Sequence, residues 1–200
     1  PISARAVLMD RRVDYAVLET ARGGIINRGL GYSAADVGIV TNIEEDHLGI
    51  DEINTLEDLA YVKSLVAEAV KQNGYAVLNA DDPYCLNIRE RIKSNIILFS
   101  LSADNEEVKN HILNGGIAIY SDGSCIFINK GGVELPFIEV KVIPATMNGI
   151  LRHNIGNSMA AIAGAIGLGI PIESIIAGLS TFRGDSDNNP GRFNIHDING

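Results

Sequence analysis

Short apolar runs alternate along the chain with longer stretches in which apolar residues recur at helical spacing. Residues 14–19, 37–43, 75–79 and 96–100 are the runs that suit strands buried on both faces of a sheet. Between most of them, apolar positions three and four residues apart predict helices. This order is typical of crossover units, in which helices join parallel strands. The pattern predicts an α/β fold, with a mostly parallel sheet flanked by helices.

The pattern changes between residues 116 and 142. Residues 117–120 and 125–128 are short β-rich runs, and each is followed by four turn-forming residues. Two apolar stretches of helical period follow at residues 155–168 and 172–179, separated by Gly-Ile-Pro. We expect an antiparallel hairpin extension beside the parallel sheet, and then two helices.

Composition and charge exclude several classes of protein. The 200 residues include 16 basic and 25 acidic side chains, which give a formal net charge of −9, and 46% are hydrophobic. A chain of this kind is expected to be globular, and its negative charge repels nucleic acid and anionic membranes. The most apolar stretch, residues 159–172, is shorter than a membrane span. We therefore predict neither a nucleic-acid partner nor a membrane partner.

The cysteines indicate the compartment. There are two, Cys85 and Cys125, far apart in the sequence. The chain opens on no basic-then-apolar leader. Disulfides are rare in the reducing cytosol, so we expect two reduced structural thiols in a cytoplasmic protein.

Two of the predicted strands end in polar residues with the chemistry of a cation site. Glu19-Thr-Ala-Arg-Gly-Gly ends the first, and Thr41-Asn-Ile-Glu-Glu-Asp-His47 ends the second. Ligands of open α/β sheets bind at the carboxyl ends of the strands, and oxygen donors with one imidazole suit Mg²⁺. The alternative is that the acidic stretch, residues 44–58, is a solvated loop and helix start.

The helix expected next begins at a capping box formed by Thr55 and Asp58. At about 100° per residue, Lys63 falls on the apolar stripe of this helix. The opposite face then holds Glu57, Tyr61, Ser64, Glu68 and Lys71. A lysine that faces the core must lose its charge or find a partner, and a neutral amine can react with CO₂ to give a carbamate. The alternative is that the Lys63 stem crosses the edge of the core and its amine reaches water.

The segment Arg152-His-Asn-Ile-Gly-Asn157 precedes the apolar helix of residues 155–168. Asn154 and Asn157 fall in the first turn, where asparagine side chains cap free backbone N–H groups. The functional alternative is that these amides meet a purine edge, or that the helix terminus faces a phosphate.

Six motifs, in this order and spacing, resemble those of the central ATPase domain of the Mur ligase superfamily. They are residues 19–24, 41–48, Lys63, 79–83, 153–157 and 190–194. The resemblance covers nearly the whole chain. It implies an ATP-dependent amide ligase, which activates a carboxylate as an acyl phosphate and joins it to the amine of an amino acid.

The resemblance also implies catalytic residues. Glu19 and His47 match Mg²⁺ ligands of the superfamily. Lys63 matches a lysine that is carbamylated in relatives, where the added carboxylate helps to hold a second Mg²⁺. The inward position found for Lys63 from the helical spacing agrees with that role.

Contacts to the nucleotide are implied in the same way. Asn154 and Asn157 match residues on the adenine side, and Arg192 matches an arginine at the hinge to a C-terminal domain. The cofactors implied are ATP and Mg²⁺. The partners implied are ATP and an amino-acid or poly-amino-acid substrate.

Different members of the superfamily share these motifs. Residues 19–24, 46–50 and 190–194 most resemble the ligases that add arginine to a poly-aspartate backbone. Muramyl-peptide ligases and folylpolyglutamate synthetases are the enzyme alternatives. Outside the enzymes, the alternative is a non-catalytic nucleotide-binding or assembly module.

One family motif is missing. No Gly-x-x-x-x-Gly-Lys-Ser/Thr phosphate loop occurs in the 200 residues. We therefore expect residues 1–182 to be a central ATPase domain without its phosphate-loop segment, and residues 183–200 to be a linker and the start of a C-terminal domain. Such a chain should not hydrolyse ATP by itself. Its incomplete sheet would expose an apolar edge, so we also expect homo-oligomers.

Overall fold

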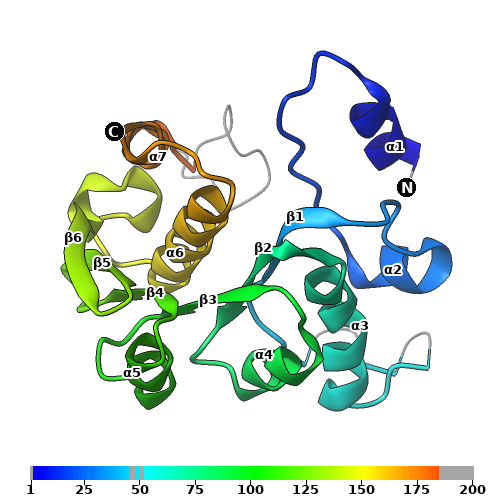
Figure 1. Ribbon diagram of the computed structural model, residues 1–200, viewed down its shortest axis with the longest axis horizontal. Helices are drawn as coiled ribbons and strands as arrows, with labels where there is room; N and C mark the ends of the chain where they lie inside the picture. Colours follow the sequence, from blue (N-terminus) through cyan, green and yellow to red (C-terminus); the bar gives the residue numbers. More distant parts are fainter. Residues whose placement is uncertain (1, 46–47, 50–51, 185–200) are drawn as a thin grey trace, which may run out of the picture. The chain divides into compact units, whose positions relative to one another are not determined.

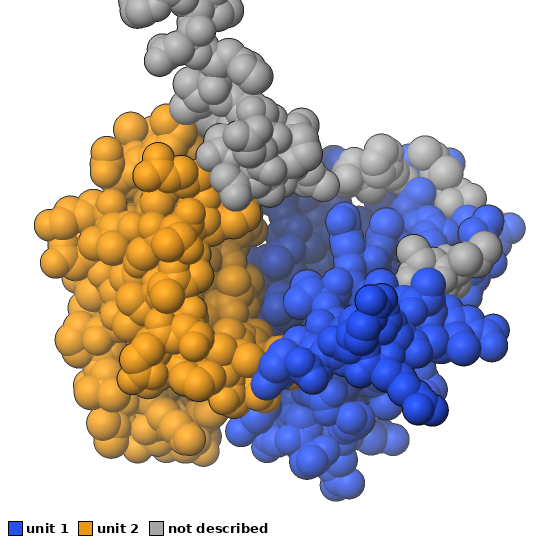
Figure 2. Space-filling model, turned by 90° about the horizontal axis from the view of Figure 1, so that it is seen from above, with its two compact units in different colours: residues 1–97 blue, residues 98–200 orange. Residues whose placement is uncertain are grey.

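The computed structural model describes residues 2–45, 48–49 and 52–184. The chain divides into two compact units, residues 1–97 and 98–200, which are coloured separately in Figure 2. The first unit contains α1 (Ile2–Met9), α2 (Arg22–Arg28), β1 (Ala35–Val40), α3 (Leu56–Glu68), β2 (Val70–Asn79), α4 (Pro83–Asn87), the 3₁₀ helix η1 (Ile88–Arg91) and the start of β3 (Asn95–Ser100). The second contains the end of β3, α5 (Glu106–Leu113), β4 (Ile117–Ser121), β5 (Cys125–Lys130), β6 (Val133–Glu139), the 3₁₀ helices η2 (Val140–Val142) and η3 (Pro144–Thr146), α6 (Arg152–Gly167) and α7 (Ile172–Thr181).

A parallel strand pair joined by a helix forms the centre of the first unit. β1 and β2 are parallel, and Val40 lies opposite Leu78 in their register. α3 makes the crossover between the two strands and packs on β1 (Figure 1). The core of this unit includes Leu59, Val77 and Leu78, each at most 1% exposed. The predicted α/β fold, with parallel strands and flanking helices, is confirmed.

The helix and the strand approach most closely at Gly38 in β1. A Cβ atom built at Gly38 would lie 2.5 Å from the carbonyl oxygen of Val66 in α3 and 2.8 Å from a methyl carbon of Val70. Backbone cannot give way as a flexible side chain can, so this position admits no side chain. The missing Cβ therefore sets how closely α3 lies on the sheet.

The first predicted strand, residues 14–19, is wrong. This segment joins α1 to α2 and forms no strand. The side chains of Tyr15 and Val17 are 62% and 94% exposed. A strand requires hydrogen-bonding neighbours and apolar cover, which a favourable local composition does not supply.

An antiparallel meander forms the sheet of the second unit. β4 pairs with β5, and β5 pairs with β6, so that Ile128 lies between Ile119 and Leu135. Both α5 and α6 pack on β4 (Figure 1). The core includes Met159 and Ile162 of α6, both fully buried. The predicted antiparallel extension and the two predicted helices are confirmed.

Two further expectations concern the cysteines and the membrane. Both Cys85, which is buried, and Cys125, which is partly buried, carry free thiols, as expected. In the described part of the chain, every helix is too short or too polar to cross a membrane. The linker predicted at residues 183–200 lies outside the described residues except for its first two, so that boundary stays a prediction.

Candidate functional site

Three side chains from three elements hold the loop that follows β1. We call residues 41–45 the β1 loop. Lys63 of α3 donates from Nζ to the carbonyl oxygen of Asn42 at 2.9 Å. Asn79, at the end of β2, donates from Nδ2 to the carbonyl oxygen of Thr41, the loop residue before Asn42, at 2.9 Å. The Asp82 carboxylate accepts from the backbone N–H of Ile43, the loop residue after Asn42, at 2.5 Å. Three consecutive loop residues are thus fixed at the carboxyl edge of β1.

The predicted capping box places the start of α3. The Thr55 hydroxyl accepts from the backbone N–H of Asp58 at 3.1 Å, and the Asp58 carboxylate accepts from the backbone N–H of Thr55 at 3.0 Å. The backbone N–H of Asn54, followed by the Thr55 groups, holds the pKa of Asp58 below its usual value. The box fixes the first turn of the helix, and hence the direction in which Lys63 reaches the β1 loop.

The prediction that Lys63 lies on the apolar stripe of α3 is confirmed, whereas its chemical role stays a prediction. Leu59 and Val62 of the same stripe are buried, Lys63 is half-buried, and its amine bonds to the β1 loop. Ser64 lies with Glu68 on the opposite face, as predicted, and it is fully buried there. η1 packs against α3, and the Ser64 hydroxyl donates to the Glu68 carboxylate at 2.6 Å.

An ion pair joins the face of α3 that holds Ser64 and Glu68 to η1. Arg91 donates from Nε to Glu68 at 2.6 Å, and its guanidinium lies 4.4 Å from the centre of the Tyr61 ring. Burial alone would raise the pKa of Glu68, but the hydrogen bonds from Arg91 and Ser64 outweigh it, so the pKa is lowered. α3 is therefore held on two sides, by β1 and by η1.

Asp82 also begins α4. It is the N-cap residue, and it accepts from the backbone N–H groups of Tyr84 and Cys85 at 2.9 and 3.1 Å. Burial raises the pKa of the Cys85 thiol, and the negative charge of Asp82 adds to the rise, whereas the positive charge of Lys63 opposes it. The thiol is therefore held in its protonated form, which makes it less reactive than an exposed cysteine.

The structure describes one of the two predicted Mg²⁺ ligands. Glu19 was predicted at the carboxyl end of a strand, but residues 14–19 form no strand, so it lies in the irregular segment between α1 and α2 with its side chain exposed. His47 lies outside the described residues, as does Arg192. Across residues 2–45, 48–49 and 52–184, no group of three or more His, Cys, Asp or Glu side chains is placed to hold a metal ion. The metal-ligand roles of Glu19, His47 and Lys63 stay predictions.

The two asparagines of α6 do not cap it, so that prediction is wrong. The helix begins at Arg152 after Leu151, and no side chain caps it. Asn154 instead donates from Nδ2 to the carbonyl oxygen of Ala145 at 2.7 Å, and its Oδ1 accepts from Asn157 at 3.3 Å. Asn154 thereby ties the helix to η3. The roles of both residues in contacting adenine stay predictions.

The turn before α6 is unusual. Met147, Asn148 and Gly149 have φ values of 50°, 57° and 88°, in the left-handed region. The buried Thr146 stabilises this turn, because its hydroxyl donates to the carbonyl oxygen of Ile143 at 2.9 Å and accepts from Gly149. A non-glycine residue in this region costs about 1–3 kcal/mol and occurs where the surroundings enforce it.

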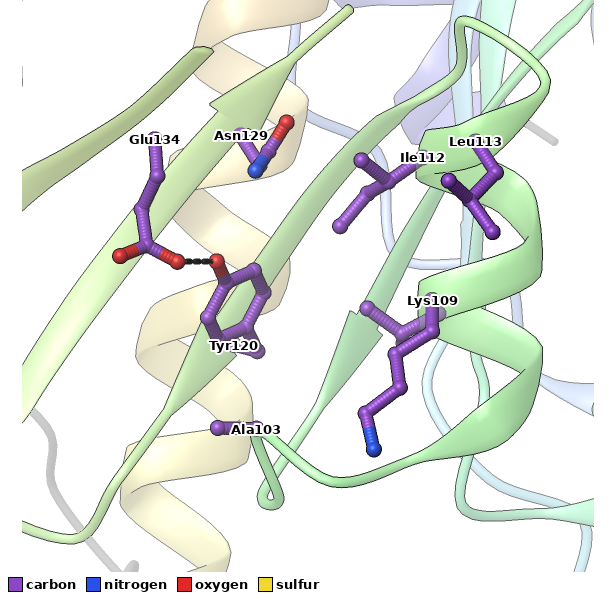
Figure 3. Close-up of a pocket in the computed structure, with 8 residues that line it drawn as sticks. Ala103, Lys109, Ile112, Leu113, Tyr120, Asn129 and Glu134 are labelled. Carbon is purple, nitrogen blue, oxygen red and sulfur yellow. Dashed lines mark hydrogen bonds between the residues drawn. The ribbon is translucent and has the colours of Figure 1, made fainter. Parts of the chain in front are cut away.

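A pocket of about 420 Å³ lies between α5 and the meander of the second unit (Figure 3). Val108 and Ile112 of α5 form an apolar wall of the pocket. On the side of the pocket formed by the strands, Tyr120 donates a hydrogen bond to Glu134. Burial and the bond to Glu134 raise the pKa of Tyr120. None of the predicted site residues lines this pocket.

Sequence reasoning missed the roles of Asn79 and Asp82 in holding the β1 loop. Both belong to the motif of residues 79–83, which contributed only to the family resemblance. A signal was available, since the two residues follow the strand parallel to β1 and so reach the same edge of the sheet.

Comparison with known proteins gives one family. The chain matches the family described as Mur ligase middle domain over residues 2–165. It is 42% identical to a protein named cyanophycin synthetase from Crocosphaera subtropica, over 99% of this chain and 23% of that protein. It is 44% identical to the protein of the same name from Trichormus variabilis, over 99% of this chain and 22% of that protein.

One further relative and one solved structure are less similar to the chain. The chain is 30% identical to UDP-N-acetylmuramate–L-alanine ligase from Clostridium novyi, over 74% of this chain and 29% of that protein. The crystal structure of MurF from Acinetobacter baumannii superposes with a TM-score of 0.55 at 20% identity, over 82% of this chain and 32% of that one, which shows a shared fold. The chain thus spans less than a quarter of the length of the cyanophycin synthetases it matches.

Proposed function

The chain belongs to the Mur ligase family, and from that membership we propose that it supplies the metal- and nucleotide-binding edge of an ATP-dependent amide ligase. The observation that carries the proposal is the 2.9 Å hydrogen bond from Lys63 to Asn42. It brings the one inward lysine predicted on α3 to the carboxyl end of β1, where ligands of α/β sheets bind.

The residues at this edge suit Mg²⁺ by their chemistry. Glu44 and Glu45 in the β1 loop offer two exposed carboxylates, and His47 follows two residues later in the sequence. Glu19, in the segment between α1 and α2, offers a third exposed carboxylate, and its approach to this edge is part of the proposal. Mg²⁺ in nucleotide sites takes one or two protein carboxylates and completes its shell with phosphate oxygens and water. We assign Glu19, His47 and a carbamate on Lys63 as the protein ligands.

The carbamate follows from the position of Lys63. Its Nζ lone pair, when unprotonated, attacks the carbon of CO₂, and the nitrogen then loses one proton to water. The product carries a carboxylate where an amine stood, and its nitrogen keeps one N–H. That N–H can still donate to the Asn42 carbonyl, so the loop contact survives the modification.

The reaction proposed has two steps. The substrate carboxylate attacks the γ-phosphorus of ATP and ADP leaves, which gives an acyl phosphate; the amine then attacks the acyl carbon, phosphate leaves, and the nitrogen loses a proton. Bound Mg²⁺ would reduce the repulsion between the carboxylate and the triphosphate. The chain's own contribution is to hold the β1 loop and Lys63 at one edge, which supplies positioning, and Glu19 would have to approach that edge from the segment before α2.

For the substrates, we propose arginine as the amine and an aspartate side chain of poly-aspartate as the acyl group. Support comes from the higher identity to the proteins named cyanophycin synthetase, 42% against 30% for the muramate–alanine ligase. We propose Asn154, Asn157 and Arg192 as nucleotide contacts. We also propose the domain boundary at residue 182, a cytoplasmic location and self-association.

A second candidate is a non-catalytic nucleotide-binding or assembly module. The sequence leaves this alternative open, since the motifs that the chain shares with the family do not by themselves require catalysis. A nucleotide-binding module requires no carbamate, so the state of Lys63 separates the two candidates.

The experiment is ¹³C NMR of the chain equilibrated with ¹³C-bicarbonate at mildly alkaline pH. We expect one protein carbamate signal that disappears in Lys63→Arg. The matched control is Lys71→Arg, because Lys71 is exposed and its Nζ pairs with Asp36 at 2.6 Å. A carbamate signal that survives Lys63→Arg, or no signal in the unaltered chain, would contradict the assignment of Lys63.

A further inference from the structure

We propose that Asp82 is a positioning residue for the proposed metal site at the carboxyl end of β1, an inference that rests on the proposed function. Its carboxylate holds the β1 loop at Ile43, and so fixes the place from which the loop presents Glu44 and Glu45. Asp82 would touch neither ATP nor the reacting carboxylate. It would act through the backbone of the loop.

The two oxygens of Asp82 divide their contacts. Oδ1 accepts from the backbone N–H groups of Tyr84 and Cys85, at 2.9 and 3.1 Å, and so caps α4. Oδ2 accepts from the backbone N–H of Ile43 at 2.5 Å and, at the longer distance of 3.5 Å, from the thiol of Cys85. A single carboxylate therefore joins the start of α4 to a loop 39 residues earlier in the chain.

The contact lies where the β1 loop leaves the core. The Ile43 side chain is 3% exposed, whereas the next two residues, Glu44 and Glu45, are both exposed. Ile43 is thus held twice, by its buried side chain and by its N–H on Asp82. A residue fixed in this way sets the direction of the chain that follows it.

The simpler explanation is that Asp82 only caps α4. The two roles need different chemistry, and Asp82→Asn separates them. Asparagine caps helices about as well as aspartate, because its one oxygen can accept from Tyr84 and Cys85. Its NH₂ group would then face the N–H of Ile43, and two donors cannot bond to each other.

The experiment is amide hydrogen exchange of Asp82→Asn, followed residue by residue by NMR. We expect the Ile43 amide to exchange between about tenfold and a hundredfold faster, from the loss of a hydrogen bond to a charged acceptor. The Tyr84 and Cys85 amides should keep their protection. Unchanged exchange at Ile43, or equal acceleration at all three amides, would overturn the positioning role.

The matched control is Asp122→Asn. Asp122 also accepts from two backbone N–H groups, those of Ser124 and Cys125, both at 2.8 Å, but it lies in the turn between β4 and β5. We expect it to leave exchange at Ile43 unchanged. Asp82→Ser is the second variant, because serine caps a helix with a side chain too short to reach the loop. It should accelerate Ile43 exchange as Asp82→Asn does.

Mn²⁺ binding, measured as a probe for Mg²⁺, tests whether the position of the β1 loop affects the proposed metal site. In Asp82→Asn we expect at least tenfold weaker Mn²⁺ binding, with a melting temperature that changes no more than in the Asp122→Asn control. Equal Mn²⁺ affinity in Asp82→Asn and the unaltered chain would overturn the positioning role and leave the proposed function intact. No Mn²⁺ binding by the unaltered chain would contradict the proposed function, and Ile43 exchange would still decide whether Asp82 holds the loop.

Discussion

At the scale of single residues, Lys63 shows how one side chain can serve both packing and chemistry. Its stem lies on the stripe that includes the buried Leu59 and Val62, so α3 keeps a continuous apolar face. Its amine meets a carbonyl oxygen of the β1 loop, which compensates for its partial removal from water. A conservative change to arginine would keep the charge but remove the nucleophilic amine that the proposed carbamate requires.

Glu68 gives a prediction for the dependence of stability on pH. Its pKa is lowered in the folded chain, because the bonds from Arg91 and Ser64 outweigh the effect of burial. A carboxylate of this kind stabilises the fold fully above its unfolded pKa, about 4.3, and loses that contribution as the pH falls through the lower folded value. We expect Glu68→Gln to flatten the acid side of the curve of unfolding free energy against pH.

The measurement is urea unfolding of the unaltered chain and of Glu68→Gln, from pH 6 down to the lowest pH at which both still fold. Their unfolding free energies should differ most at pH 6 and converge as the carboxylate is protonated. Glu57→Gln, at an exposed position of the same helix, is the control. An equal change in both variants would contradict the role given to the Arg91 contact.

Local spacing predicted some residue environments and not others. The inward position of Lys63 followed from helical period alone, because β1 covers that face. The burial of Ser64 was not predicted, because η1 covers that face of α3 and the residues of α3 alone do not indicate this second neighbour. Asn154 was misread as a cap, because its actual acceptor, the carbonyl of Ala145, is set by the preceding turn.

At the scale of elements, the distance between α3 and β1 depends on Gly38. A Cβ there would meet the carbonyl oxygen of Val66 at 2.5 Å, and relieving that overlap requires the helix to move. We expect Gly38→Ala to lower the unfolding free energy by about 1–3 kcal/mol, the usual cost of overpacking. Urea unfolding followed by circular dichroism measures it.

Gly178 is the matched control for that substitution. It lies in the interior of α7, and a Cβ built there meets nothing within 4 Å. We expect Gly178→Ala to be neutral or to stabilise by up to about 1 kcal/mol, from the better helix propensity of alanine. Destabilisation of the same size in both variants would show that the approach of α3 is not what Gly38 controls.

Element types were predicted better than strand pairing. β1, β2, β4, β5 and both C-terminal helices lie close to where alternation and helical period placed them, since each has a neighbour that buries its apolar residues, whereas β6 was not predicted and β1 ends at Val40 rather than at residue 43. Residues 14–19 have the composition of a buried strand, yet Val17 is 94% exposed. Pairing depends on which other strands are present, and that information is not local to the segment.

At the scale of the whole molecule, the lack of a phosphate loop limits what the chain can do alone. Glycine-rich backbone N–H groups and a lysine normally neutralise the β- and γ-phosphates. A chain with net charge −9 and no such loop should not turn over ATP. We expect the rate of phosphate release from ATP in the presence of Mg²⁺ to be the same with the chain as in buffer alone. Turnover that Lys63→Ala abolishes would contradict this expectation.

Paramagnetic broadening by Mn²⁺ in the amide NMR spectrum of the ¹⁵N-labelled chain tests the metal edge most directly. If the edge after β1 binds the divalent cation, the first signals to broaden belong to residues 41–45 and to the neighbours of Glu19, and excess Mg²⁺ restores them. Broadening centred on other acidic groups, such as Asp104 with Glu106 near α5, or spread evenly over the chain, would contradict a metal site at this edge.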